Sequence, residues 1–204
     1  MSTYSYIGFE TMEQYRELWG IEVDYRPFIL TEVMSHAKNA FSPFKLPFMF
    51  ADLKRTTQIA GIPFRGTPKS YPYDSSTALR TLQFLKVHHP RLMAPAMRTL
   101  WRLEYVECRA PDSVETIKQA LDGVVAPGLI DEAVKRDDTL VAVVENTGEV
   151  KKMRGFGAPT ILVFKDSHVA RPQMYFGSDR FEHIAIHLDK EFLPTKQLFA
   201  NARL

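Results

Sequence analysis

The chain has 204 residues, of which 45% are hydrophobic and 25% charged, and its formal net charge is +2. This composition is typical of a globular protein with a sizeable core, and the scattered basic residues predict no nucleic-acid partner and no anionic membrane partner. No apolar run approaches the ~18–20 residues of a membrane span and the N-terminus has no signal-peptide pattern, so we expect a soluble intracellular protein.

The first part of the chain predicts a helix, a strand and a second helix. Over residues 6–18 apolar residues recur every three or four positions, which is typical of a helix, and Gly20 ends it. The apolar face of this helix consists of Phe9, Met12, Tyr15 and Trp19. Residues 21–25 alternate between apolar and polar, as a short strand does. Residues 39–45 are predicted as a loop, and residues 48–60 as a helix that Gly61 ends.

The middle of the chain is predicted to be entirely helical. The predicted helix starts are Ser75 or Ser76, Pro95, Asp112, Pro127 and Asp138. Asp112 and Glu115 have the spacing of a capping box. The last of these helices spans residues 138–153, with Leu140, Val141 and Val144 as its apolar face.

The C-terminal part predicts a hairpin and a last helix. Residues 160–164 and 173–176 read as strands, with a turn at residues 165–168, and a helix follows Gly177-Ser178-Asp179. The fold class is therefore α/β, in which a domain with strands is interrupted by an all-helical insertion.

A polar turn, Ser2-Thr3-Tyr4-Ser5, lies directly before the first helix. Free backbone N–H groups and the helix dipole favour an anion there, and a serine hydroxyl that donates to a bound thiol lowers the thiol pKa from roughly 8.5. The chain's one cysteine, Cys108, forms neither an internal disulfide nor a Cys-x-x-Cys pair, so that thiol must come from a ligand. The alternative is that Ser2 or Ser5 only caps the helix.

Two further segments have the character of binding sites. Pro159 follows a glycine-rich stretch and precedes a strand, so it is a candidate cis proline, and an extended peptide can pair with the backbone of Ala158. Ser178 can cap the last helix while its N–H groups bind a carboxylate, and Asp179 can accept from an ammonium group. The alternatives are a plain helix-to-strand turn and an ordinary capping pair.

In this order the three features resemble the kappa class of glutathione transferases. The family's opening turn has the form Ser-Pro-Tyr-Ser-Trp-x-Gly-Phe-Glu, which residues 2–10 follow with Thr3 in place of proline. Further matching positions are Arg26-Pro27, Met34, Asn39, Ala51-Asp52-Leu53-Lys54, residues 155–159 and Phe176-Gly177-Ser178-Asp179-Arg180. The resemblance covers nearly the whole chain.

The resemblance implies a thioredoxin-like domain, residues 1–45 and 138–204, interrupted by a helical insertion domain, residues 46–137. It also implies a relationship to bacterial disulfide oxidoreductases and to 2-hydroxychromene-2-carboxylate isomerases. In the family a β-strand precedes the opening serine and lies between the strands predicted here at residues 21–25 and 160–164. Only Met1 stands in that place, so one alternative is a non-catalytic, truncated isoform that acts as a binding or interaction protein.

Carried over to this chain, the resemblance implies that Ser2 is the catalytic residue that hydrogen-bonds the glutathione sulfur. Thr3 and Tyr4 correspond to its neighbours in the glutathione site, and Asn39 to a polar contact from the loop.

The remaining part of the implied site holds the rest of glutathione. Ala158, before a cis Pro159, corresponds to the residue that pairs with the cysteinyl backbone. Ser178 and Asp179 correspond to the residues that hold the γ-glutamyl end.

The implied activity is that of a glutathione transferase in detoxification, which conjugates glutathione to a small electrophilic substrate or reduces peroxides. The family also implies a homodimer and no metal. Glutathione-dependent isomerisation of 2-hydroxychromene-2-carboxylate is an alternative, whereas a disulfide oxidoreductase is disfavoured because Ser2 and Ser5 stand where paired cysteines would be needed. The C-terminal Ala202-Arg203-Leu204 resembles a peroxisomal address, with the mitochondrion as the alternative location.

Overall fold

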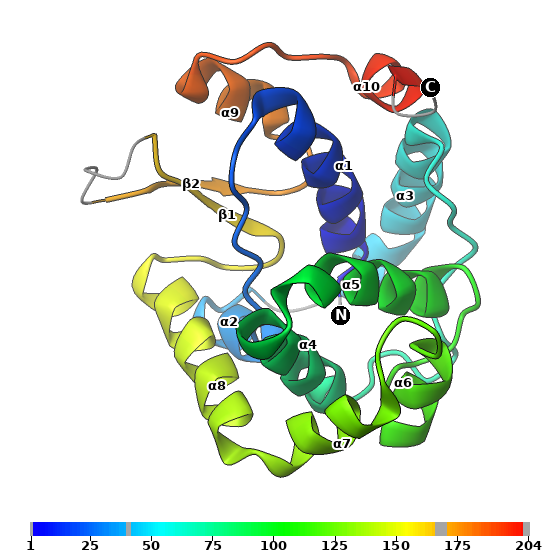
Figure 1. Ribbon diagram of the computed structural model, residues 1–204. Coiled ribbons are helices and arrows are strands. Elements are labelled where there is room, and N and C mark those ends of the chain that lie inside the picture. The colour runs from blue at the N-terminus through cyan, green and yellow to red at the C-terminus, as the bar shows by residue number, and fades with distance from the viewer. Residues whose placement is uncertain (1, 40–41, 166–170, 202–204) are drawn as a thin grey trace. The chain divides into compact units, whose positions relative to one another are not determined.

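The computed structural model in Figure 1 describes residues 2–39, 42–165 and 171–201. The chain forms two compact units. The first comprises Met1–Val23, Val33–Ile62 and Val150–Leu204, and the second comprises Asp24–Glu32 and Pro63–Glu149. The domain boundaries predicted at residues 45 and 138 do not coincide with the limits of these units and stay a prediction.

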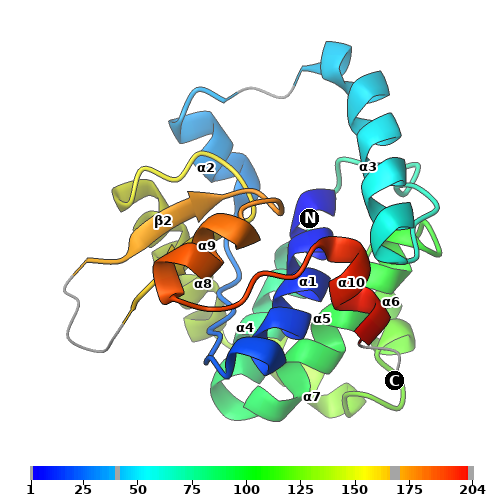
Figure 2. The ribbon, with the colours of Figure 1, turned by 90° about the horizontal axis from the view of Figure 1, so that it is seen from above.

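The first unit combines helices with a hairpin. Its elements are α1 (Thr3–Trp19), the 3-10 helix η1 (Pro43–Lys45), α3 (Leu46–Ala60), β1 (Thr160–Val163), β2 (Gln173–Phe176), α9 (Phe181–Leu188) and α10 (Thr195–Asn201). A further helix, α2 (Leu30–His36), begins in the second unit and ends in the first. Helix α10 packs beside α3 and α1 (Figure 2). Helices α2 and α10 have no counterpart among the predicted elements.

Helix α1 has the buried face that its sequence predicts. Phe9, Met12, Tyr15 and Trp19 are all at most 9% exposed, and Gly20, at a φ of 61°, ends the helix in the left-handed region. The ring of Tyr15 stacks on that of Trp19 at a centroid distance of 4.1 Å. The first predicted helix and its apolar face are therefore confirmed.

The C-terminal end of α1 is tied to the segment between α9 and α10. The Tyr15 hydroxyl donates to the carbonyl of Leu193 at 2.6 Å, and the Trp19 indole N–H donates to the carbonyl of Glu191 at 2.7 Å. Burial raises the pKa of Tyr15 to about 12, which favours the protonated phenol in the folded state. The bond to Leu193 therefore persists throughout the neutral pH range.

Tyr15→Phe is expected to lower the free energy of unfolding by roughly 1–2 kcal/mol, because the Leu193 carbonyl loses its donor. The folded-state pKa lies above the ordinary value of about 10, so the stability linked to this phenol is fully present below pH ~10 and is lost as the pH rises towards about 12. Urea unfolding at pH 8, 10 and 11 checks both points. The variant should lose less stability between the last two pH values than the original protein does, and an equal loss would contradict the assignment.

Strands β1 and β2 form the predicted hairpin. They pair antiparallel, with Thr160 opposite Phe176 and Val163 opposite Gln173. The predicted turn at residues 165–168 lies mostly outside the described residues. The strand predicted at residues 21–25 is wrong, because this segment has no regular structure. A strand forms only where its backbone groups pair with a neighbour, and among the described residues β1 and β2 pair only with each other.

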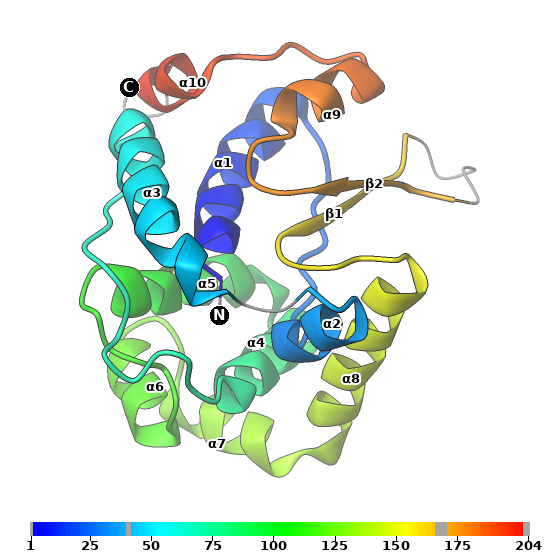
Figure 3. The ribbon, with the colours of Figure 1, turned by 180° about the vertical axis from the view of Figure 1, so that it is seen from behind.

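The second unit is helical. Its elements are α4 (Ser76–His88), α5 (Pro90–Tyr105), α6 (Val114–Ala120), α7 (Pro127–Lys135) and most of α8 (Asp137–Lys152). Helix α4 packs against α5 and α7, while α6 packs against the same two helices (Figure 3). The predicted all-helical character of this part of the chain is confirmed.

Two predicted helix starts in this unit are wrong. Helix α5 begins at Pro90, and Pro95 lies inside it. Proline is favoured at the first helical position, and both prolines fit that rule by sequence, so only the structure distinguishes them. Helix α6 is capped by Ser113, whose hydroxyl oxygen accepts from the backbone N–H of Thr116 at 3.2 Å, and not by Asp112.

The apolar face of α8 is not its buried face, because Leu140, Val141 and Val144 are exposed. The buried residues on this helix are Thr139, Val143 and Thr147. The Thr147 hydroxyl donates to the carbonyl of Val143 at 2.7 Å, so its burial leaves no polar group unsatisfied. The spacing of apolar residues along the helix therefore cannot identify a buried threonine whose hydroxyl is hydrogen-bonded within the same helix.

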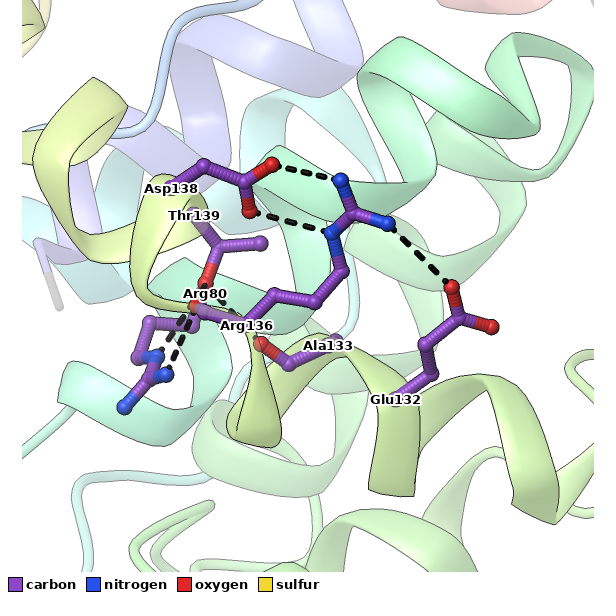
Figure 4. A network of polar contacts seen from close by, with 6 residues as sticks. All are labelled: Arg80, Glu132, Ala133, Arg136, Asp138 and Thr139. Atoms are coloured by element: carbon purple, nitrogen blue, oxygen red, sulfur yellow. Dashed lines mark hydrogen bonds and ion pairs between the residues drawn. The ribbon is translucent and has the colours of Figure 1, made fainter.

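A polar network joins the start of α8 to α4 and α7 (Figure 4). Arg80 on α4 donates to the hydroxyl of Thr139 at 3.2 Å and to the carbonyl of Arg136 at 2.9 Å. The guanidinium group of Arg136 contacts Asp138 at 2.5 Å and Glu132 at 3.5 Å. The first turn of α8 is therefore fixed within the second unit.

Candidate functional site

The opening turn lies against the loop that precedes β1. The Ser2 hydroxyl donates to the carbonyl of Ala158 at 3.3 Å, and its oxygen accepts from the backbone N–H of Ser5 at 3.4 Å. Ser2 is also the N-cap residue of α1. The predicted capping role is therefore confirmed, and the same hydroxyl connects two segments 156 residues apart.

The electrostatics of this turn favour a bound anion. The backbone N–H groups of Thr3 and Tyr4 lie in the first turn of α1, where helix geometry provides no intrahelical acceptor. The first turn contains no acidic residue, so no side chain of the turn itself offsets the positive end of the helix dipole. A thiolate or another small anion beside Ser2 would be stabilised by these N–H groups.

Tyr4 is a neutral residue of the site. Its hydroxyl donates to the carboxylate of Asp52 on α3 at 3.1 Å. Burial, with the hydrogen bond and the charge of Asp52, raises the pKa of Tyr4 to about 12. The phenol therefore stays protonated at neutral pH and cannot act as the base that removes a thiol proton.

Helix α1 rests closely against the loop before β1. The peptide bond between Ala158 and Pro159 is cis, as predicted. Gly8 faces this loop, and a Cβ atom at Gly8 would lie 3.1 Å from Cγ of Pro159 and 3.6 Å from Cβ of Ser178. The absence of a side chain at this position lets α1, Pro159 and Ser178 meet.

Asn39 contacts the same loop. Its amide group donates to the carbonyl of Phe156 at 2.9 Å. A Cβ atom at Gly157 would lie 2.9 Å from the ring of Phe176, which in turn contacts the ring of Phe156 at a centroid distance of 4.3 Å. The loop is thus held between the Asn39 amide and the end of β2.

Ser178 and Asp179 lie in the turn between β2 and α9. The Gly177 N–H donates to the carbonyl of Pro159 at 3.1 Å, which extends the hairpin pairing beyond β1 and β2. The predicted capping role of Ser178 is wrong, because α9 begins at Phe181 and its N-cap residue is Arg180, without a side-chain bond. Asp179 forms an exposed ion pair with Arg180 at 3.1 Å.

The predicted site residues therefore all lie in the first unit. Ser2 contacts Ala158 directly, while Pro159 and Ser178 both lie beside Gly8. Tyr4 is linked through Asp52, and Asn39 through Phe156. Thr3 occupies the first helical position, and no side-chain partner of Thr3 occurs among the described residues. The predicted roles of these residues in binding stay predictions.

Three residues that contact the predicted site residues were not themselves predicted: Gly8, Asp52 and Phe156. All three lie within segments that matched the family pattern, but the pattern does not say what they contact. The contact of Phe156 with Asn39 uses a backbone carbonyl, so no side-chain signal marks it. Only the folded arrangement identifies these three residues.

Comparisons with known proteins show the family of this chain. A family model described as a DSBA-like thioredoxin domain matches residues 1–189. Glutathione S-transferase kappa 1 of Caenorhabditis elegans is 32% identical over 91% of this chain and 85% of its own length. This chain belongs to the kappa class of glutathione transferases, within the DSBA-like thioredoxin family. The Homo sapiens glutathione S-transferase kappa 1 is 28% identical to this kappa-class chain. The match covers 100% of this chain and 94% of the human protein.

Solved structures show the same fold for this kappa-class enzyme. A 2-hydroxychromene-2-carboxylate isomerase superposes with a TM-score of 0.74 at 19% identity, over 92% of this chain and 90% of its own. The cytosolic disulfide reductase DsbM of Pseudomonas aeruginosa superposes with a TM-score of 0.62 at 16% identity, over 100% of this chain and 93% of its own. The predicted thioredoxin-like fold with a helical insertion is confirmed.

None of the helices in the described ranges is long and apolar enough to cross a membrane. No group of three or more histidine, cysteine, aspartate or glutamate side chains in the described part of the chain is placed to hold a metal ion.

Proposed function

We propose that this enzyme binds glutathione and stabilises its thiolate, which then attacks a small electrophilic organic compound or reduces a peroxide. The observation that carries this proposal is the position of the Ser2 hydroxyl, which lies at the N-terminus of α1 and 3.3 Å from the Ala158 carbonyl. A hydroxyl donor and a helix N-terminus meet there beside a backbone that a peptide can pair with. This combination suits a peptide that carries a thiol.

The thiolate is favoured by two effects that act at the same place. A hydrogen bond from Ser2 to the ionised sulfur stabilises the anion, and the dipole at the N-terminus of α1 adds a favourable field. Both effects lower the thiol pKa from its free value of roughly 8.5 towards neutral pH. The protein lends no nucleophile of its own, so the sulfur of the bound glutathione forms the new bond.

The remainder of glutathione has matching contacts in the first unit. The backbone of Ala158 pairs with the cysteinyl backbone, while Ser178 and Asp179 hold the γ-glutamyl end. Asn39, with Thr3 and Tyr4, completes the polar surroundings. The position of Ser178 supports this assignment, because its Cβ would lie 3.6 Å from a Cβ atom at Gly8 and Ser178 thus lies close to the helix that Ser2 caps.

Asp179→Asn is expected to raise the glutathione Kd by about ten-fold, because a carboxylate that accepts from the γ-glutamyl ammonium group contributes a charge-assisted hydrogen bond of roughly 1.5 kcal/mol. Isothermal calorimetry measures the Kd. Asp189→Asn is the matched control, since Asp189 is an exposed aspartate whose ion pair is with Lys165. An equal effect of both substitutions would contradict a specific role for Asp179.

Calorimetric titration with glutathione tests the proposed function itself. Binding at millimolar glutathione or below is expected for the folded chain. Absence of heat from folded protein would refute the proposal and favour a non-catalytic interaction protein. Turnover of 2-hydroxychromene-2-carboxylate without net consumption of glutathione would instead indicate an isomerase.

Two further proposals rest on the family. The enzyme forms a homodimer, and it is located in the peroxisome, with the mitochondrion as the alternative. The peroxisomal proposal depends on the C-terminal Ala202-Arg203-Leu204, which lies outside the described residues. Deleting these three residues from the full chain and imaging both forms in cells tests the location.

A further inference from the structure

Helix α3 and the 3-10 helix η1 before it present large apolar side chains to solvent. Phe44 in η1 is 93% exposed, and Phe48 in the first turn of α3 is 68% exposed. Ile59, near the end of the same helix, is 60% exposed. Large apolar side chains are mostly buried in folded proteins, so a group of exposed ones within one segment indicates an interaction surface.

The exposed side chains of α3 form one stripe along the helix. At 3.6 residues per turn, four exposed residues lie within about 100° of the helix circumference. They are Phe48, Ala51, Arg55 and Ile59. The buried residues of the helix lie on the opposite face and are Leu53, Thr57 and Ala60. Helix α3 packs against α1 and α10 (Figure 2), so the stripe is not part of the core of the first unit.

Basic side chains accompany the exposed rings. Lys45 and Lys54 are exposed, and neither forms an ion pair within the described ranges. The guanidinium group of Arg55 lies 6.0 Å from the centroid of the Phe48 ring, a cation–π contact at the surface. An apolar side chain and a cation therefore lie side by side on the same stripe.

The net charge of this segment is positive. Residues 42–61 contain three basic residues and one acidic residue, Asp52, so the segment carries the whole net charge of +2 and the rest of the chain is neutral overall. The carboxylate of Asp52 accepts from the Tyr4 hydroxyl at 3.1 Å and lies 3.7 Å from Arg55. Across the whole chain the basic residues are scattered, which predicted no anionic membrane partner, but this segment is a local exception.

Exposed phenylalanines beside lysines and arginines suit the surface of a lipid bilayer. The rings enter the boundary between headgroups and acyl chains, while the cations attract anionic headgroups. A protein partner needs a pocket that matches each protruding ring, whereas a bilayer accepts such a ring without one. The 93% exposure of Phe44 therefore favours a bilayer over a protein.

We propose that the η1–α3 surface docks the enzyme onto a lipid membrane that carries negative charge. The residues of this surface are Phe44, Lys45, Phe48, Lys54, Arg55 and Ile59. The contact does not involve glutathione, so its test and that of the proposed function can fail separately.

The first test removes the exposed rings. The full chain is sedimented with vesicles of phosphatidylcholine that contain about 30% phosphatidylserine, and the bound fraction gives a partition coefficient. The double variant Phe44→Ser, Phe48→Ser is expected to lower this coefficient by about 10- to 100-fold, because the apolar area that enters the bilayer is lost. Ile186→Ser on α9, at a residue that is 70% exposed, is the matched control and should leave the coefficient unchanged.

The second test removes the charges. Lys45→Gln and Lys54→Gln are each expected to lower the partition coefficient on the phosphatidylserine vesicles by about five-fold and to have no effect on vesicles of phosphatidylcholine alone. Lys190→Gln, at an exposed lysine outside the η1–α3 surface, makes the same change of charge and is the matched control. Added salt should weaken binding of the original chain to the phosphatidylserine vesicles, because it screens the headgroup charges.

A wild-type chain that does not sediment with the phosphatidylserine vesicles would overturn the proposal, and so would a double variant that binds them as the wild type does. Two measurements without lipid detect other occupants of the surface. A changed sedimentation coefficient of the double variant would assign the surface to a contact between copies, and a raised KM for a soluble electrophile would assign it to substrate binding. Either result would overturn the proposal. If circular dichroism shows that the double variant is unfolded, the lysine variants decide the outcome, because they leave the apolar side chains in place.

Discussion

Ser2→Ala is expected to lower kcat/KM for glutathione conjugation by about 100- to 1000-fold, the size of effect seen when one donor to a developing anion is removed from an active site. The substitution removes the hydroxyl that lies at the N-terminus of α1. The pKa of the bound thiol should rise towards its free value, because the helix N-terminus alone remains to stabilise the anion. Thiolate absorbance measured against pH reports this pKa directly.

The control for this experiment separates catalysis from helix capping. Alanine at an N-cap costs about 0.5–2 kcal/mol of stability, whereas glycine there costs only a few tenths. Ser2→Gly therefore removes the hydroxyl and largely keeps the cap. Equal losses of activity in the two variants would assign the effect to the donor. If activity instead followed stability and Ser2→Gly remained active, Ser2 would be a cap only.

Gly8→Leu is expected to lower the free energy of unfolding by about 3 kcal/mol and the activity by about 100-fold. A Cβ atom at this position would lie 3.1 Å from the rigid ring of Pro159, so a leucine side chain pushes α1 away from the loop. The same displacement moves Ser2 relative to Ala158, and a shift of about 1 Å in an active site can cost 100-fold in rate.

Gly128→Leu on α7 is the matched control for Gly8→Leu. Gly128 is also a helical glycine, but a Cβ atom there would meet no atom within 4 Å. Leucine at this position should leave activity unchanged and raise helix stability by up to ~1 kcal/mol. Urea unfolding and steady-state kinetics on both variants check the prediction. Retention of full activity by Gly8→Leu would show that the close contact is not needed for function.

Structural features that depend on residues close together in the sequence could be predicted from the sequence. The apolar spacing in residues 6–18 identified α1 and its buried face, and Gly20 ended it as expected. The β1–β2 hairpin followed from two short apolar runs, and its second strand has the predicted bounds, Gln173–Phe176. In each case the local pattern and the final packing require the same residues on the same face.

Features that depend on distant partners could not be predicted in this way. Residues 21–25 have the alternation of a strand but no neighbouring strand in the described chain. The valines of α8 have the spacing of a core face, but satisfied threonines occupy the core instead. The Tyr4–Asp52 bond joins residues 48 positions apart, and neither residue has a local feature that marks it.

The link between Ser2 and Ala158 has a consequence for ligand selectivity. The Ser2 hydroxyl has one hydrogen, and the part-buried carbonyl of Ala158 now receives it. A sulfur that takes this hydrogen leaves the carbonyl without a donor, at a cost of about 1–3 kcal/mol. A ligand with a backbone N–H beside its thiol supplies the replacement, whereas a simple alkyl thiol does not. The opening turn should therefore prefer peptide thiols over bare thiols by roughly 10- to 100-fold.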